Sequence, residues 1–186
     1  MKIFRKLTMF CFCFCVCSGM VALPAWASDE CGDSDPNVSI RGCTAKIQAG
    51  GRALDIAVYY QNRAAAYSRL KQYDKAIADF TQALNLGNHH PLIYCNRANT
   101  YNQIHQYDAA IADANMAIKI VSEDSHPEYL ADALAKGYAV RALAYLGKND
   151  RPRAEADFRK ALTVEGAPDW ALDEVRRMMA NNGITR

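Results

Sequence analysis

The stretch "YQNRAAAY" (60–67) has the spacing of one buried face of an α-helix. Tyr60, Ala64 and Tyr67 recur at positions i, i+4 and i+7, which lie on one side of a helix. Arg63 lies at the edge of that face, about 60° from Tyr60 at 100° per residue. A guanidinium beside a face meant for the core needs a partner from elsewhere in the chain.

The same pattern returns as "YCNRANTY" (94–101) and "YAVRALAY" (138–145). Residues 59–84 and 93–118, at an offset of 34, are identical at 13 of 26 positions. Residues 137–162 match the first stretch at 11 positions, at an offset of two periods plus ten inserted residues. A fixed period of this size indicates stacked repeats, each of which buries its apolar face against its neighbours.

Each unit is expected to contain a second helix, whose core face in the first unit is Ala76, Phe80 and Ala83. The alanines matter because two helix axes approach closely only where the side chains between them are small. Pro91 and Pro168 fall where new helices are expected to open. The sequence therefore predicts an all-α fold.

This pattern resembles the tetratricopeptide repeat, a 34-residue helix-turn-helix unit. The resemblance implies repeats stacked into a right-handed α-solenoid. The residues that carry it are Tyr60, Ala64, Tyr67, Ala76, Phe80, Ala83, Tyr94, Ala98, Tyr101, Ala110, Ala117, Tyr138, Ala142, Tyr145, Ala154, Phe158 and Ala161. Arg63, Arg97 and Arg141 stand where the family usually has leucine, and Ala114 replaces its usual large second-helix residue.

Both flanking regions are expected to cap the stack, because terminal repeats of a solenoid need an outer polar face. Residues 35–50 match residues 72–87, which predicts a second helix that lacks its own first helix. The expected organisation is a signal peptide (1–27), an N-terminal half-repeat cap (28–53), three repeats within 54–166 (about 57–90, 91–124 and 127–166, the last with an extended first helix) and a C-terminal capping helix (167–186).

The first 27 residues have the order of a secretory signal peptide: a basic start, an apolar run and an Ala-x-Ala site ending at Ala27. We expect cleavage there, an exported chain of 159 residues beginning at Ser28, and a bacterial periplasmic or secreted location. An uncleaved membrane anchor is the alternative, although the apolar run is short for a span of about 20 residues.

Three cysteines follow the leader, and an exported protein can form disulfides. Cys31 and Cys43 are expected to form a bridge that holds the N-terminal segment over the end of the stack; two unpaired thiols are the alternative. Cys95 falls in the groove that the resemblance implies, either as a packed thiol or as a point of intermolecular disulfide formation.

Charge argues against a nucleic-acid partner. Three of the 22 basic residues lie in the leader, which leaves 19 against 20 acidic residues and a net charge of −1. No basic run interleaves with aromatic residues, and both signs of charge are interspersed. We expect a protein or peptide partner, no nucleic acid, no membrane association after cleavage, and a monomer or weak self-association.

Each arginine of the repeats has a carboxylate sixteen residues later. Asp79, Asp113 and Asp157 follow Arg63, Arg97 and Arg141, which in a helical hairpin places an acid on the second helix opposite the guanidinium on the first. We predict three stacked ion pairs, because a planar guanidinium suits a bidentate carboxylate. A ladder of anion-binding arginines is the alternative.

No enzyme motif is present: the chain has no phosphate loop, no nucleophile elbow and no His-Glu-x-x-His helix. His89, His90 and His126 fall in connections along one edge of the stack and could gather on a metal, but polar loop residues are the stronger interpretation. We expect no catalytic residue, no metal and no cofactor.

The resemblance implies a working surface on the concave face, which the first helices line. Its slots fall on Gln61, Asn62, Arg69, Cys95, Asn96, Asn99, Gln103 and Lys136. An amide both donates and accepts, so it can pair with the backbone of an extended peptide. The alternative is that these amides are ordinary exposed polar residues. Only Asn96 and Lys136 match the slots with which one subfamily clamps a C-terminal carboxylate, so we do not expect that clamp.

The ten-residue insertion is expected to form a polar loop (122–126) and an extension of the next helix (127–146). Tyr129, Leu130 and Ala133 form either an exposed partner patch or extra core. Together these features predict a non-catalytic exported scaffold that binds a peptide or protein in its groove. A membrane-tethered assembly factor is the alternative, and an enzyme or metal-binding protein with an unrecognised site is a distant third.

Overall fold

The structure is a computed structural model that describes residues 30–184, and this part of the chain contains helices and no strand. The helices are α1 (Pro36–Ala49), α2 (Ala53–Arg69), α3 (Tyr73–Asn85), α4 (Pro91–Gln103), α5 (Tyr107–Glu123), the 3₁₀ helix η2 (Pro127–Leu130), α6 (Ala131–Gly147), α7 (Arg151–Leu162) and α8 (Asp169–Asn181). The all-α helical-repeat solenoid predicted from the sequence is confirmed.

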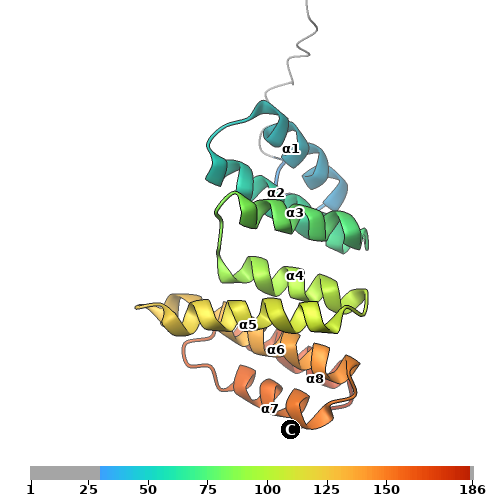
Figure 1. Cartoon of the computed structure of the whole chain (residues 1–186), viewed down its shortest axis with the longest axis vertical. Helices are drawn as coiled ribbons and strands as arrows, with labels where there is room; N and C mark the ends of the chain where they lie inside the picture. Colours follow the sequence, from blue (N-terminus) through green and yellow to red (C-terminus); the bar gives the residue numbers. More distant parts are fainter. Residues whose placement is uncertain (1–29, 185–186) are drawn as a thin grey trace, which may run out of the picture.

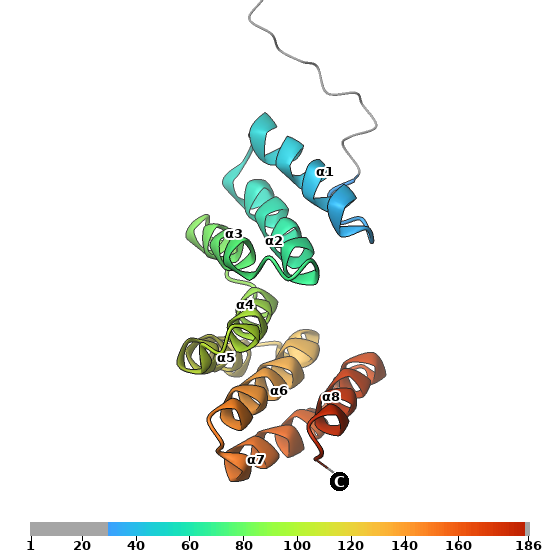
Figure 2. The ribbon, with the colours of Figure 1, turned by 90° about the vertical axis from the view of Figure 1, so that its right-hand side faces the viewer.

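Helices α1 to α7 stack in chain order along one axis, and α8 folds back beside α6 (Figure 1). Three hairpins form the repeats: α2 packs on α3, α4 on α5 and α6 on α7, with α1 before them and α8 after them. Figure 2 shows the stack curved like a C, with α3, α5 and α7 on the outer side and α8 beside α6 on the inner side. The first helices of the repeats therefore line the concave face.

The turn inside each hairpin has the same backbone geometry. The second residue after each first helix adopts the left-handed conformation. The backbone N–H of the residue that follows it donates to the carbonyl of the second tyrosine of the repeated stretch. The left-handed residues are Lys71, His105 and Asn149 (φ 57°, 61° and 60°), and the bonds are Gln72 N to Tyr67 O (2.9 Å), Gln106 N to Tyr101 O (3.0 Å) and Asp150 N to Tyr145 O (2.8 Å). This capping bond ends the first helix and aims the chain back along it.

The core consists mainly of alanines, and at one equivalent position two of the three repeats carry a phenylalanine. Phe80 and Phe158 are fully buried at equivalent positions of the first and third repeats. Ala114 takes this position in the second repeat. Where α6 faces this part of α5 it carries Gly137, and a Cβ on Gly137 would lie 3.1 Å from Ile118 Cγ1. The smaller pair of residues lets α6 approach α5 closely.

The insertion before the third repeat differs in detail from the expectation of one continuous helix from residue 127. A 3₁₀ turn with proline in its first positions covers Pro127–Leu130, and the α-helix begins only at Ala131. Ala133 is fully buried whereas Tyr129 is 81% exposed. The insertion thus contributes extra core through α6 and leaves Tyr129 on the surface.

The expected leader (1–27) lies outside the described residues. Within residues 30–184, no helix has the combination of length and apolar character that a membrane span requires.

Candidate functional site

Each arginine of the repeated stretch forms a bidentate ion pair with the aspartate sixteen residues later. Nε and Nη2 each donate to one carboxylate oxygen, so the two planar groups lie fork to fork. The Nε and Nη2 distances are 2.6 and 2.9 Å for Arg63–Asp79, 2.7 and 2.8 Å for Arg97–Asp113, and 2.7 and 2.9 Å for Arg141–Asp157.

The remaining guanidinium nitrogen, Nη1, reaches across to the preceding helical unit. It donates to Thr44 Oγ1 from Arg63 (3.0 Å), to Thr81 Oγ1 from Arg97 (2.9 Å) and to Asn115 Oδ1 from Arg141 (2.6 Å). Each arginine therefore joins its own two helices and also ties them to the unit before. The sequence reasoning missed this third contact, although the alignment of Thr44 with Thr81 was a visible signal.

Aromatic rings and the paired acid enclose the guanidinium group of Arg63. Its Cζ lies 5.3 Å from the Tyr60 ring centroid and 5.8 Å from that of Tyr67, within the range of cation–π attraction. The side-chain hydrogen bonds with Asp79 raise the pKa of Arg63 above its ordinary value. With Nε, Nη1 and Nη2 all bonded to protein groups, Arg63 has the geometry of a structural strut.

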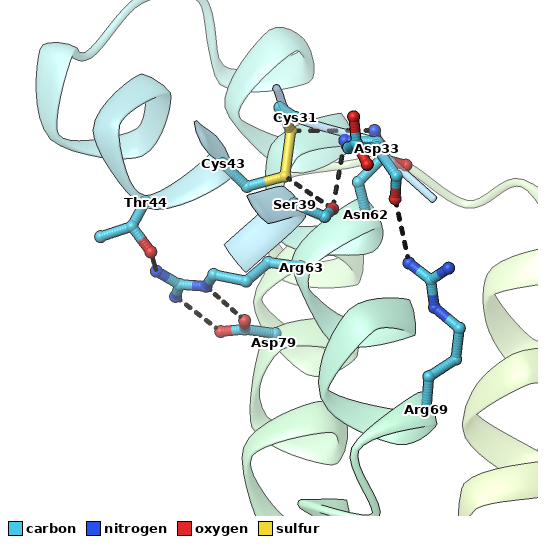
Figure 3. The surroundings of a disulfide bond; sticks show 10 residues. Cys31, Asp33, Ser39, Cys43, Thr44, Asn62, Arg63, Arg69 and Asp79 are labelled. Atoms are coloured by element: carbon cyan, nitrogen blue, oxygen red, sulfur yellow. Dashed lines mark hydrogen bonds and ion pairs between the residues drawn. A yellow bond between two sulfur atoms is a disulfide. The ribbon is translucent and has the colours of Figure 1, made fainter. Parts of the chain in front are cut away.

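The segment before α1, which we call the N-terminal clip (residues 30–35), is fastened over the first repeat (Figure 3). The structure joins Cys31 to Cys43 of α1, with a Cα–Cα distance of 4.4 Å. Gly32 N donates to Ser39 Oγ at 3.1 Å. The clip passes so close to α1 that a Cβ at Gly42 would lie 2.6 Å from Glu30 Cβ, so only glycine fits there without displacement.

Two residues that the resemblance placed in the groove instead hold this clip. The Arg69 guanidinium donates to the carbonyls of Ser34 (2.8 Å) and Asp33 (3.2 Å), and Asn62 Nδ2 lies 3.9 Å from Cys31 Sγ. The physical reason is that the half-repeat has no first helix of its own. The clip takes the place of that helix against α2.

Of the two interpretations of Cys95, the structure supports the packed thiol, and Cys95 is not part of the groove surface. Its side chain is fully buried between α4 and α6, where Sγ donates to the Ala133 carbonyl at 3.4 Å. The extra first turn of α6 covers it, and burial raises the pKa of the Cys95 thiol to about 12. An intermolecular disulfide through Cys95 would require this helix pair to open.

Lys136 is also engaged, because α8 packs beside α6 at this end of the concave face. Lys136 Nζ lies 3.8 Å from Glu174 Oε1, and the two side chains are 24% and 32% exposed. Ala139, which follows Lys136 on the same helix face, is fully buried. At the third repeat, α8 therefore covers part of the concave surface that α6 would otherwise expose to solvent.

A hollow on the concave face, which we call the amide groove, lies between the C-terminal halves of α4, α6 and α8, beside the turn from α4 to α5. It has a volume of about 550 Å³. Its polar lining includes Asn99 and Gln103 of α4, Asn181 of α8 and the following residue Asn182, together with Asn102, His105 and Tyr107. Leu143 and Met178 supply apolar walls. Asn99 and Gln103 were predicted; Asn181 and Asn182 were missed, because the C-terminal helix was treated only as a cap.

Asn102 forms part of the wall of the same groove, and only the donor side of its amide has a hydrogen-bond partner among the described residues. Its Nδ2 donates to the Val140 carbonyl at 2.8 Å, which fixes the orientation of the side-chain amide. Its Oδ1 is buried and has no hydrogen-bond donor within residues 30–184. The amide groove thus contains one buried acceptor atom to which no group of the described part of the chain donates.

A smaller hollow, the Trp170 pocket, lies where the N-terminal halves of α4, α6 and α8 meet. Its volume is about 80 Å³. Its lining includes Leu92, Asn96, Asp132, Lys136, Trp170 and Glu174. Trp170 is 60% exposed, and on the neighbouring α2 Leu54 and Val58 are exposed at 59% and 43%. The amide of Gln61, also on α2, accepts a hydrogen bond from Asn88 Nδ2 at 3.3 Å.

The histidines have local structural contacts. Nδ1 of His89 and of His105 bonds to the hydroxyl of Tyr94 (3.1 Å) and of Tyr107 (2.7 Å), and His90 Nδ1 accepts from Leu92 N at 3.3 Å. No group of three or more His, Cys, Asp or Glu side chains within residues 30–184 is arranged to hold a metal ion.

These features define a solenoid of helical hairpins with a concave, amide-lined surface. Residues 57–87, which form most of the first repeat, match the sequence model of the family described as Tetratricopeptide repeat. This match identifies residues 57–87 as a tetratricopeptide repeat. The solved structures described next show that the rest of the described chain has the fold of such repeats.

Solved structures of the same fold cover most of the described chain. The Sgt2 TPR domain from Aspergillus fumigatus is 26% identical, with a TM-score of 0.52 over 72% of this chain and 89% of that domain. The MamA protein is 21% identical, with a TM-score of 0.55 over 81% of this chain and 69% of that one. The first TPR domain of Spaghetti (RPAP3), bound to the HSP90 peptide SRMEEVD, is 22% identical, with a TM-score of 0.52 over 70% and 95%. No curated protein sequence matches this chain.

Proposed function

We propose that this protein is a non-catalytic exported scaffold that binds an extended peptide segment of a partner protein in its amide groove. The observation that carries the proposal is that amides from α4 and α8 line one hollow of about 550 Å³. Because each amide can donate and accept at once, such a lining can pair with a peptide backbone whatever its side chains are. The RPAP3 domain of the same fold, solved with a bound peptide, supports this type of ligand.

The proposed ligand differs from the acidic chaperone tail seen with RPAP3. Of the polar slots that clamp a C-terminal carboxylate, this chain retains only Asn96 and Lys136. The ammonium group of Lys136 already faces Glu174 at 3.8 Å. A terminal carboxylate would therefore compete with a carboxylate of the protein for this lysine.

Export is part of the proposal and is supported by two features. The first 27 residues have the composition of a secretory leader. The bridged pair Cys31–Cys43 suits an oxidising compartment. Intact-mass measurement of the native protein tests this part: a chain beginning at Ser28 excludes the membrane-tethered alternative, and a retained leader excludes export by cleavage.

Site-specific photo-crosslinking in the native cells tests the groove. A photoreactive amino acid at Asn99 or Gln103 is expected to capture a partner, which mass spectrometry of the cross-linked tryptic peptides then identifies. The matched control is Lys119, an exposed residue on the outer helix α5. Equal capture from Lys119 and from the groove positions would contradict the proposed binding surface.

A further inference from the structure

The Trp170 pocket has an unbalanced set of charges. Asp132 lines it, is half-buried, and has no hydrogen-bond or ion-pair partner among the described residues. Glu174 lines it as well and shares the single cation, Lys136, at 3.8 Å. Asp132 lies in the first turn of α6. The pocket therefore presents two carboxylates against one ammonium group.

The pocket walls can accommodate the methylene stem of a long basic side chain, such as that of lysine or arginine. Leu92, Ala139 and Met178 supply apolar surface around a space of about 80 Å³, which is narrow enough to hold a methylene stem. Trp170 borders the same space with an indole that is 60% exposed and has no cation stacked on it in the described part of the chain. An indole face attracts a cation more strongly than any other aromatic side chain does.

From this complementarity we infer that the peptide carries a lysine or arginine that anchors in the Trp170 pocket, an inference that rests on the proposed function of the groove. The stem lies between Leu92 and Met178, and the cation faces Asp132 and Glu174 beside Trp170. The amide groove holds the backbone further along α4. The partner is therefore a protein with a basic residue in an extended segment, and acidic tails are disfavoured.

Peptide pools of one length provide the test. Three pools of decapeptides differ only at a central position, which is lysine, norleucine or glutamate, with the other positions drawn from Ala, Leu, Ser and Gln. Binding is followed by the fluorescence of Trp170, which is the only tryptophan of the exported chain from Ser28 onward. The lysine pool should bind about tenfold more tightly than the norleucine pool, and the glutamate pool most weakly.

Asp132→Asn should reduce the preference for lysine over norleucine severalfold, since it removes the unpaired charge and keeps the shape. The matched control is Asp74→Asn, which changes an exposed acid in the first turn of α3, away from the pocket. Circular dichroism and urea unfolding check that both variants are folded.

The outcomes separate this inference from the proposed function. Equal binding of the lysine and norleucine pools, or a preference that Asp132→Asn leaves intact, overturns the basic anchor. The groove itself still stands in that case if the double variant Asn99→Ala, Gln103→Ala weakens the binding of all pools. Failure of a folded chain to bind any pool overturns the proposed peptide groove, and the anchor with it.

Discussion

Nε and Nη2 of Arg97 donate to the two carboxylate oxygens of Asp113 at 2.7 and 2.8 Å, which makes a bidentate ion pair. The side chains are only 15% and 11% exposed. The third nitrogen, Nη1, bonds to Thr81 of the preceding repeat at 2.9 Å. Two ionic groups so far removed from water depend on each other, because either one alone would be a buried charge without a partner.

The first prediction is that Arg97→Ala lowers the free energy of unfolding by about 2–4 kcal/mol, mostly because it strands the Asp113 carboxylate. Asp113→Ala should cost a similar amount, and the double variant should cost clearly less than the sum of the two. Urea unfolding followed by circular dichroism measures all three.

A second cycle on the exposed pair Arg52–Asp55 serves as control for the first. Those side chains are 84% and 41% exposed, so the corresponding alanine variants should leave the unfolding curve unchanged. Strict additivity in the Arg97–Asp113 cycle would show that the two groups do not stabilise each other.

The second prediction concerns the contact between repeats. Thr81→Val keeps the shape of the side chain but removes the oxygen that accepts from Arg97, so it should cost about 1–2 kcal/mol. Because that bond joins adjacent repeats, the unfolding transition should also become broader. Thr163→Val is the matched control: Thr81 and Thr163 both donate to a carbonyl of their own helix, but within residues 30–184 the Thr163 hydroxyl has no partner outside that helix. Equal effects of the two variants would argue against an inter-repeat role for Thr81.

Periodic features could be predicted from the sequence because each appears more than once. The hairpins follow from the 34-residue period, and the partner of Arg63 follows from an acid at the same distance after Arg97 and Arg141. Cys95 shows where this reasoning fails. Its equivalent in the first repeat, Gln61, is half-exposed, but the carbonyl of Ala133 lies against Cys95 because the insertion alters the start of α6.

The ends of the chain have no repeated counterpart, so alignment of the repeats says nothing about what they cover. Arg69 is held by backbone carbonyls of the clip, and Lys136 faces an acid of α8. For the same reason Trp170, which α8 brings to the concave face, could not be placed there from the repeat pattern. The repeats thus predict the scaffold, while its two ends decide how much of the groove stays open.

The third prediction is that Cys31 and Cys43 are bridged in the native protein. Trypsin cuts after Arg41 and after Lys46, so a digest without reductant should contain the pentapeptide 42–46 linked to the peptide that carries Cys31. Replacing both cysteines by serine should lower the free energy of unfolding by about 2–3 kcal/mol, since the loop of 12 residues is no longer closed.

Hydrogen exchange distinguishes a local from a global effect of the bridge. The double serine variant should exchange faster in the clip, and α6–α8 should be unaffected. Recovery of the pentapeptide 42–46 alone from the native protein, with its thiol free, would refute the bridge.

The fourth prediction uses the buried thiol between α4 and α6. Burial raises the pKa of Cys95 from 9.0 to about 12, so the folded protein keeps the proton where the unfolded chain loses it. The thiol contributes no pH dependence below about pH 8, because both states are then protonated. Above the unfolded pKa the unfolded state binds fewer protons, so stability falls by up to about 1.4 kcal/mol per pH unit between roughly pH 9 and pH 12.

Cys95→Ala isolates this contribution from the titration of tyrosines and lysines in the same range. Its unfolding free energy starts lower, because the variant loses the hydrogen bond to Ala133 and leaves a small void. Its decline above pH 9 should nevertheless be shallower than that of the native sequence. In the native state at pH 8, N-ethylmaleimide should label Cys95 only as fast as the helices open, and denaturant should make labelling immediate. Rapid labelling of the folded protein, or parallel pH profiles for the two sequences, would mean that the first turn of α6 does not cover this thiol in solution.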